Sequence, residues 1–200
     1  MSKPIKYRRK NRRKRKGQIK NQEKNMVFLS CNVSSIKNRL LSLEKVVNDL
    51  KLSFFCLQET HVKKEGTIKF ENSLKYQIYE LTRKNKNGGG LALGVIKELN
   101  PFWIKDGGVE TEALTVKISI KQLCIRITNA YGPQEYDSED KKHKFWNYLD
   151  FQLIECEKEG TGCMILFDCN AWVGSKILKN DPRRQNKNGA LLENFMIRYP

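Results

Sequence analysis

The sequence predicts an α/β fold from three patterns. An apolar run, Met164–Phe167, ends abruptly at the carboxylate of Asp168, which is typical of a buried strand whose end presents ligands at the edge of a sheet. Residues 26–58 have the pattern of strand, helix and strand with short joins, which implies a right-handed parallel crossover. Two alternating segments, 112–120 and 123–131, predict an antiparallel hairpin. We therefore expect one α/β domain with parallel and antiparallel strands.

The two strands of the predicted crossover each end in a polar side chain. Residues 26–31 form the first strand pattern and end at Asn32, and residues 53–58 form a second, buried strand that ends at Glu59. Parallel strands joined by one crossover end at the same edge of a sheet, so Asn32 and Glu59 should emerge side by side.

Two amphipathic helices are expected against the sheets. The first would be capped by Ser34 or Ser35 and would bury a face at helical spacing, namely Ile36, Leu40, Leu43, Val47 and Leu50. The second should start at Asp137 or Ser138 and run to about residue 158, with a buried side made of Phe145, Trp146, Leu149, Leu153 and Ile154.

The remaining segments predict hairpins. Residues 76–80 and 91–96 are strand candidates joined by the basic, glycine-rich segment 83–90. A hairpin loop is favoured there over a phosphate cradle, because no helix follows and no GxxxxGK pattern exists. The second hairpin turns at Lys121 and Gln122, and its alternation predicts one wet face.

Asp168 and Asn170 are the first candidate site residues. Side chains alternate along an extended chain, so these two should point into one cavity while Cys169 points back into the protein. A carboxylate can act as a general base or metal ligand, and a carboxamide can orient a water or a phosphate oxygen. The alternative for a lone strand-end aspartate is a turn former or helix cap.

The net charge of +16 is concentrated at the N-terminus. Residues 1–25 contain twelve of the 38 basic residues and one of the 22 acidic residues. Such a segment cannot bury a core, so we expect a disordered tail that binds nucleic acid or serves as a nuclear address, with a merely solvated tail as the alternative. The candidate nucleic-acid-binding residues are Arg8, Arg9, Lys10, Arg12, Arg13, Lys14, Arg15 and Lys16.

Cysteine spacing and hydropathy indicate the cellular compartment in which the protein is expected. The six cysteines include no CxxC pair and most lie in apolar runs, which favours reduced core thiols over a zinc site or a disulfide framework. The first 25 residues lack the apolar core of a signal peptide, and no apolar run is long enough to span a bilayer. We expect a nuclear or cytoplasmic protein that is not secreted and does not contact a membrane.

Four strand-end motifs, in this order, resemble those of the endonuclease/exonuclease/phosphatase family. They are Asn32, Gln58-Glu59-Thr60, Asn129-Ala130-Tyr131-Gly132-Pro133 and Asp168-Cys169-Asn170. The segments Leu57–His61, Gly88–Leu93 and Asn188-Gly189 with Leu191, Leu192 and Phe195 look most like the endonuclease domain of non-LTR, LINE-type retrotransposons. The resemblance covers residues 26–200. It implies a DNase-like four-layer α/β sandwich, in which two mostly antiparallel or mixed sheets are flanked by helices.

The resemblance also implies a mechanism of phosphodiester hydrolysis. Glu59, helped by Asn32, would hold Mg²⁺, with Mn²⁺ as an alternative ion. Asp168 would deprotonate the attacking water, Asn170 would orient it, and Tyr131 would hydrogen-bond the phosphate. Structural alternatives are a turn residue at 32, a solvated acid at 59 and sheet packing at 131.

Several departures from the family pattern bear on activity. The family's catalytic histidine belongs to a Ser-Asp-His-type motif that has no counterpart here, so we expect the domain to be incomplete at its C-terminus and this chain to be weakly active or inactive. His61 is expected to be a solvated loop residue, and His143 to face water on a helix. Phe167 and Cys169 stand where glycine and phenylalanine are common.

The expected partner is DNA, with RNA as an alternative for the basic tail. The retrotransposon resemblance implies that a longer parent encodes a reverse transcriptase downstream. Two other functions remain open at this point: a non-catalytic nucleic-acid-binding remnant, and an abasic-site endonuclease or exonuclease of the same fold.

Overall fold

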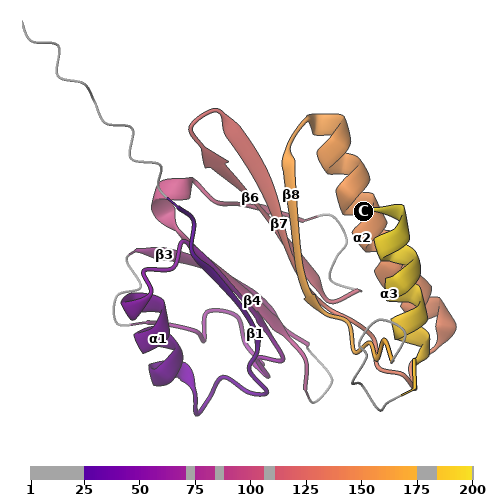
Figure 1. The fold of residues 1–200 in the computed structure, drawn as a ribbon. Helices are drawn as coiled ribbons and strands as arrows, with labels where there is room; N and C mark the ends of the chain where they lie inside the picture. Colours follow the sequence, from indigo (N-terminus) through magenta and orange to yellow (C-terminus); the bar gives the residue numbers. More distant parts are fainter. Residues whose placement is uncertain (1–24, 71–74, 84–87, 106–110, 175–183, 200) are drawn as a thin grey trace, which may run out of the picture.

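The computed structural model describes residues 25–70, 75–83, 88–105, 111–174 and 184–199. They form two four-stranded sheets, with strand orders β1-β2-β4-β3 and β5-β6-β7-β8 (Figure 1). The basic tail predicted over residues 1–25 lies outside the described residues except for Asn25. In the described part of the chain, no helix has the length and apolar character needed to cross a bilayer.

The first sheet contains the predicted crossover. Its strands are β1 (Phe28–Asn32), β2 (Phe54–Gln58), β3 (Tyr76–Leu81) and β4 (Leu91–Ile96), and α1 (Leu40–Asp49) connects β1 to β2. The β1–β2 pair is parallel, as predicted, and β4 runs antiparallel to both β2 and β3. The basic, glycine-rich segment therefore belongs to a hairpin between β3 and β4.

The second sheet contains the predicted hairpin and a second crossover. Its strands are β5 (Phe102–Ile104), β6 (Ala113–Ile120), β7 (Leu123–Tyr131) and β8 (Gly162–Asp168). The helix α2 (Glu139–Glu159) carries the chain from β7 to β8, which pair in parallel. Among the described strands, β8 pairs only with β7, and its side chains are half-buried rather than fully buried as expected.

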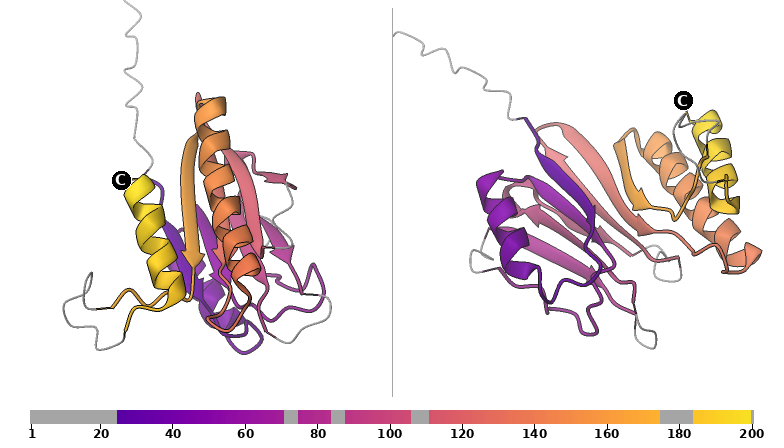
Figure 2. Two further views of the ribbon diagram at one scale, coloured as in Figure 1. Left: turned by 90° about the vertical axis from the view of Figure 1, so that its right-hand side faces the viewer. Right: turned by 60° about the horizontal axis from the view of Figure 1, so that its bottom comes forward.

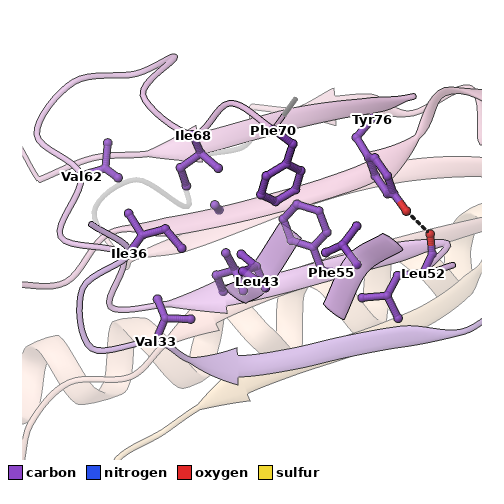
Figure 3. Close-up of a cluster of buried hydrophobic side chains, with 12 residues drawn as sticks. Val33, Ile36, Leu43, Leu52, Phe55, Val62, Ile68, Phe70 and Tyr76 are labelled. Atoms are coloured by element: carbon purple, nitrogen blue, oxygen red, sulfur yellow. Dashed lines mark hydrogen bonds between the residues drawn. The ribbon is translucent and has the colours of Figure 1, made fainter. Parts of the chain in front are cut away.

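The molecule has four layers. The helix α1 covers the outer face of the first sheet, while α2 and α3 (Lys187–Arg198) cover the outer face of the second (Figures 1 and 2). Three apolar clusters separate these layers, and the middle one lies between the two sheets. Figure 3 shows the cluster beneath α1, where Phe55 packs near Tyr76, whose hydroxyl donates to the carbonyl of Leu52 at 2.6 Å. The predicted four-layer sandwich is confirmed.

The predicted serine cap of α1 is wrong. The helix begins at Leu40, and within the described residues no side chain caps it. Ser34 and Ser35 instead have positive φ angles of 43° and 85°. The backbone N–H of Ser35 donates to the carbonyl of Glu59 at 2.8 Å, so this turn is tied to the end of β2 rather than to the helix. Leu50, predicted to be buried, is 55% exposed because it follows the last helical turn.

The outward face of the β6–β7 hairpin is not exposed to solvent, contrary to expectation, because α2 covers it. The hydroxyls of Thr115 and Tyr148 lie 3.0 Å apart in the buried interface. Arg126 is only 5% exposed and donates to Glu159 of α2 at 2.6 Å. Polar residues on this face therefore meet polar partners on the helix. Ile154, predicted to be buried, is 43% exposed on the opposite side of α2.

A buried amide pair joins the two sheets. Asn129 of β7 is fully buried, and its side-chain amide donates to the carbonyls of Leu57 at 3.0 Å and Ala92 at 2.9 Å. Its oxygen accepts from the amide of Gln58 at 2.7 Å. Three polar groups of the first sheet thus depend on one side chain of the second, and buried polar groups are costly to leave unpaired.

Replacing Asn129 by leucine should lower the free energy of unfolding by about 3 kcal/mol, because the buried amide of Gln58 and two carbonyls would lose a partner. Urea unfolding of the variant measures this loss. The matched control is Asn147→Leu at an exposed position of α2, which should change stability by less than about 0.5 kcal/mol. Equal effects of the two substitutions would refute the bridging role.

Candidate active site

The ends of four strands bring the sequence-predicted site residues together. Asn32 and Tyr131 are the last residues of β1 and β7, Asp168 is the last residue of β8, and Glu59 directly follows β2. In the parallel pairs, Asn32 is opposite Gln58 and Tyr131 is opposite Asp168. The parallel register and the packing of the two sheets therefore bring all four strand ends together at one edge of the sandwich. We call this edge, formed by Asn32, Glu59, Tyr131 and Asp168, the mouth.

A hydrogen bond between Asn32 and Asp168 connects the two sheets at this mouth. The side-chain amide of Asn32 donates to Oδ2 of Asp168 at 2.9 Å. The amide oxygen of Asn32 accepts from the backbone N–H of Ser34 at 3.0 Å. Asn32 thus forms the local turn and also orients a carboxylate that lies 136 positions later in the chain.

Glu59 is held by Tyr131 on one side and faces His61 on the other. The hydroxyl of Tyr131 donates to Oε1 of Glu59 at 2.5 Å, and Nε2 of His61 lies 3.6 Å from Oε2. Burial acts to raise the pKa of Glu59, but hydrogen bonds from Tyr131 and Asn32 and attraction to His61 outweigh it, and this pKa lies below its ordinary value. Glu59 is therefore an anion at neutral pH.

Tyr131 keeps its proton at this site. Burial, followed by its hydrogen bond to anionic Glu59, raises the pKa of Tyr131 well above its ordinary value. Gln134 donates to the hydroxyl oxygen of Tyr131 at 2.5 Å, which leaves the O–H directed at the carboxylate. Tyr131 is therefore a fixed hydrogen-bond donor rather than a base.

The chain turns directly after Asp168, so the extended geometry expected for residues 168–170 is wrong. Asn170 has a φ of 51°, and its backbone N–H donates to Oδ1 of Asp168 at 3.0 Å. The Asn170 side chain donates to the carbonyl of Gly132 at 2.9 Å and lies within hydrogen-bonding reach of Tyr131. Asn170 still reaches the site, but through the turn. Cys169 packs inward as predicted, and burial raises the pKa of its thiol to about 11.

Gly132 explains why the motif after Tyr131 contains a glycine. A Cβ at this position would lie 2.7 Å from the Cα of Cys169. The N–H of Gly132 donates to the carbonyl of Asp168 at 2.7 Å. The close approach of the two chain segments beyond β7 and β8 therefore requires a residue without a side chain.

The oxygen donors at the mouth suit a hard divalent cation. Glu59 and Asp168 supply carboxylates and Asn32 supplies an amide oxygen, and Mg²⁺ is usually held by one or two carboxylates while it retains several waters. Within the described residues, no group of three or more His, Cys, Asp or Glu side chains gathers to hold a metal. The donor set fits a partly hydrated Mg²⁺ and not an all-protein cage.

A cavity of about 510 Å³ opens beside Glu59 and Tyr131. Its lining includes residues that have no role in the strand-end motifs, namely Arg83, Gln134, Tyr136, Asp137 and Lys141. Arg83 forms an ion pair with Glu112, and both belong to segments whose sequences indicated only a hairpin. His61 is an exposed loop residue, as expected, and it also lines this cavity and lies close to Glu59. His143 is exposed on α2, as predicted.

Solved structures with a similar fold were found by structural comparison. The endonuclease domain of TRAS1, a telomere-specific non-LTR retrotransposon, is 16% identical with a TM-score of 0.59, over 87% of this chain and 70% of that chain. An AP endonuclease from Archaeoglobus fulgidus is 20% identical with a TM-score of 0.58, over 86% and 70%. The AP endonuclease LMAP from Leishmania major is 14% identical with a TM-score of 0.65, over 86% and 66%.

No protein-family model and no curated protein sequence matches the chain. At these identities the structural likeness establishes the fold. The chain has the endonuclease/exonuclease/phosphatase fold that its strand-end motifs predicted.

Proposed function

We propose that this site hydrolyses phosphodiester bonds of DNA weakly, with the help of Mg²⁺, for which Mn²⁺ can substitute. The observation that carries the proposal is the connected network of Asn32, Glu59, Tyr131, Asp168 and Asn170 at the ends of strands from both sheets. The similarity to a retrotransposon endonuclease domain and to AP endonucleases supports a nuclease.

Asp168 is the proposed general base. Asn32 and Asn170 each donate one hydrogen bond to its carboxylate and fix its orientation. A carboxylate offers about four acceptor positions, so these two bonds leave capacity to take a proton from a water. A base held in one orientation at a strand end is suited to in-line activation of that water.

Glu59 and Asn32 are the proposed metal ligands. A bound Mg²⁺ would polarise the phosphate and neutralise the charge that develops on its oxygens. The lowered pKa of Glu59 keeps its carboxylate available at neutral pH. Tyr131, whose proton is retained, would turn its O–H from Glu59 to a phosphate oxygen once the metal holds Glu59 and substrate occupies the mouth.

Substitution of either carboxylate tests the reaction. Asp168→Asn and Glu59→Gln should each reduce Mg²⁺-dependent nicking of supercoiled plasmid by roughly 10²- to 10⁴-fold, because each removes a charge and keeps the side-chain shape. DNA affinity in EDTA should change little. The control variants Asp140→Asn and Glu65→Gln alter exposed carboxylates that do not belong to this network and should nick like the unmodified chain. If both site variants kept full activity, the assignment would be wrong.

A second candidate function is DNA or RNA binding without turnover, and the charge of the N-terminal tail favours it. The twelve basic residues in 1–25 can neutralise phosphates irrespective of sequence. The two candidate functions can be tested separately, because the tail would contribute to DNA affinity whereas the strand-end carboxylates would contribute to the rate of hydrolysis.

Deleting residues 1–25 should weaken DNA binding and reduce the slope of log K against log salt by roughly 0.9 for each phosphate that the tail neutralises. The cleavage rate at saturating DNA should stay the same, since the tail holds none of the proposed catalytic residues. Binding across a salt series and single-turnover cleavage measure the two effects. An unchanged salt slope would show that the tail does not neutralise DNA phosphates. Loss of cleavage at saturating DNA would show that the tail contributes to the reaction and not only to binding.

A further inference from the structure

A second cavity, of about 460 Å³, opens between the segment 35–40 that leads into α1 and the loop of residues 60–68. Its aliphatic wall consists of Ile36, Leu40, Val62 and Ile68. Three of these side chains, Ile36, Val62 and Ile68, lie at one end of the apolar cluster beneath α1 (Figure 3). An apolar side chain placed in the second cavity would therefore extend that cluster.

Both walls of the second cavity are held in place by the rest of the fold. Glu80 of β3 is only 5% exposed, and its carboxylate accepts from the backbone N–H groups of Ile68 at 2.8 Å and Thr67 at 3.4 Å. The N–H of Ile36 donates to the carbonyl of Thr60 at 3.0 Å, which joins the two walls. A cavity whose walls are fixed in advance binds a partner with little ordering cost.

The charges that line the second cavity are positive. Apart from His61, the ionisable side chains in its lining are Lys37, Lys63 and Lys64, and all three are exposed. The exposed Glu65 lies in the same loop but does not line the cavity. Because complementary charges face each other across specific interfaces, an occupant of this cavity should carry negative charge around its apolar part.

The aliphatic wall favours a peptide over a nucleic acid. Among the described residues that line the second cavity, only His61 has a ring, whereas sites that hold single-stranded nucleic acid stack the bases on aromatic side chains. A phosphate backbone has no apolar group with which to fill an aliphatic cavity. A peptide can present a large apolar side chain to the cavity and carboxylates to the lysines beside it.

We propose that the second cavity docks an acidic segment of a partner protein. One large apolar side chain of that segment enters the cavity, and the aspartates or glutamates on either side of it meet Lys37, Lys63 and Lys64. This inference goes beyond the proposed nuclease function and does not depend on it. Since His61 lines both cavities, a partner docked here would lie next to the mouth.

Fluorescence anisotropy of labelled peptides bound to the full chain tests the proposed docking. The probe is a peptide of glutamates with one central tryptophan, and the comparison peptide has alanine in place of the tryptophan. The basic tail attracts both peptides equally, so the ratio of their dissociation constants reports the apolar cavity. The tryptophan peptide should bind at least about 10-fold more tightly, the gain expected from burying one large apolar side chain.

Reversing two of the lysine charges tests the electrostatic part of the docking. Lys63→Glu combined with Lys64→Glu should weaken binding of the tryptophan peptide about 10-fold, because two attractions become repulsions. The control combines Lys45→Glu with Lys97→Glu, which makes the same change of net charge at exposed lysines outside the lining. All four positions are exposed, so both double variants should keep the fold.

A pair of adjacent leucines tests the apolar part. Leu40 is half-buried and lines the second cavity, whereas Leu41 is 78% exposed and does not. Leu40→Ser should reduce the advantage of the tryptophan peptide over the alanine peptide, and Leu41→Ser should leave it unchanged.

The inference is overturned if the two peptides bind equally, if the control pair of lysine substitutions weakens binding as much as the pair in the lining, or if both leucine variants behave alike. Duplex DNA is the competing occupant. A duplex that loses affinity in the Lys63→Glu, Lys64→Glu variant, together with peptides that bind equally, would assign this surface to nucleic acid and reject the docking of an acidic segment.

Discussion

The amide pair between Asn129 and Gln58 is the constraint on which the site depends. It lies in the interior between the two sheets, within an apolar cluster that by itself imposes little register. A shift of one sheet against the other would leave several buried polar groups unpaired, at a cost of roughly 1–3 kcal/mol each. Glu59 is the next residue after Gln58, and Tyr131 is two residues after Asn129. The position of one sheet relative to the other therefore sets where Glu59 and Tyr131 lie at the mouth.

Backbone conformation completes this geometry. Glu59, His61 and Asn170 all have positive φ angles, and so do Ser34 and Ser35 in the turn that follows β1. Non-glycine residues in this region cost of order 1 kcal/mol or more and persist where surrounding contacts hold them. Here the contacts are the hydrogen bonds from Ser35 to Glu59 and from Asn170 to Asp168. The strands end in turns that aim polar side chains across the mouth.

Much of the strand framework and of the site could be predicted because the signals are local. Apolar runs in the sequence predicted β2 and β4, and the predicted parallel crossover implied that Asn32 lies beside Glu59, as it does in the structure. The start of α1 and the coverage of the β6–β7 hairpin could not be predicted, since both depend on contacts between distant segments. Arg83 was missed for the same reason, because its partner Glu112 is far away in sequence. The end of β8 at Asp168 was predicted, but the turn at Asn170 was missed because the alternation of an extended chain was assumed to continue past that end.

The proposed chemistry requires the carboxylate of Glu59 to hold a divalent cation at the mouth formed by both sheets. Crystals of the chain grown with Mn²⁺ and examined by anomalous scattering test this requirement most directly. We expect a single strong peak on the side-chain oxygens of Glu59, next to Asn32 and Asp168, which disappears in Glu59→Gln. Manganese bound elsewhere, with the Glu59 carboxylate still contacted by Tyr131, Asn32 and His61, would contradict the proposed metal site.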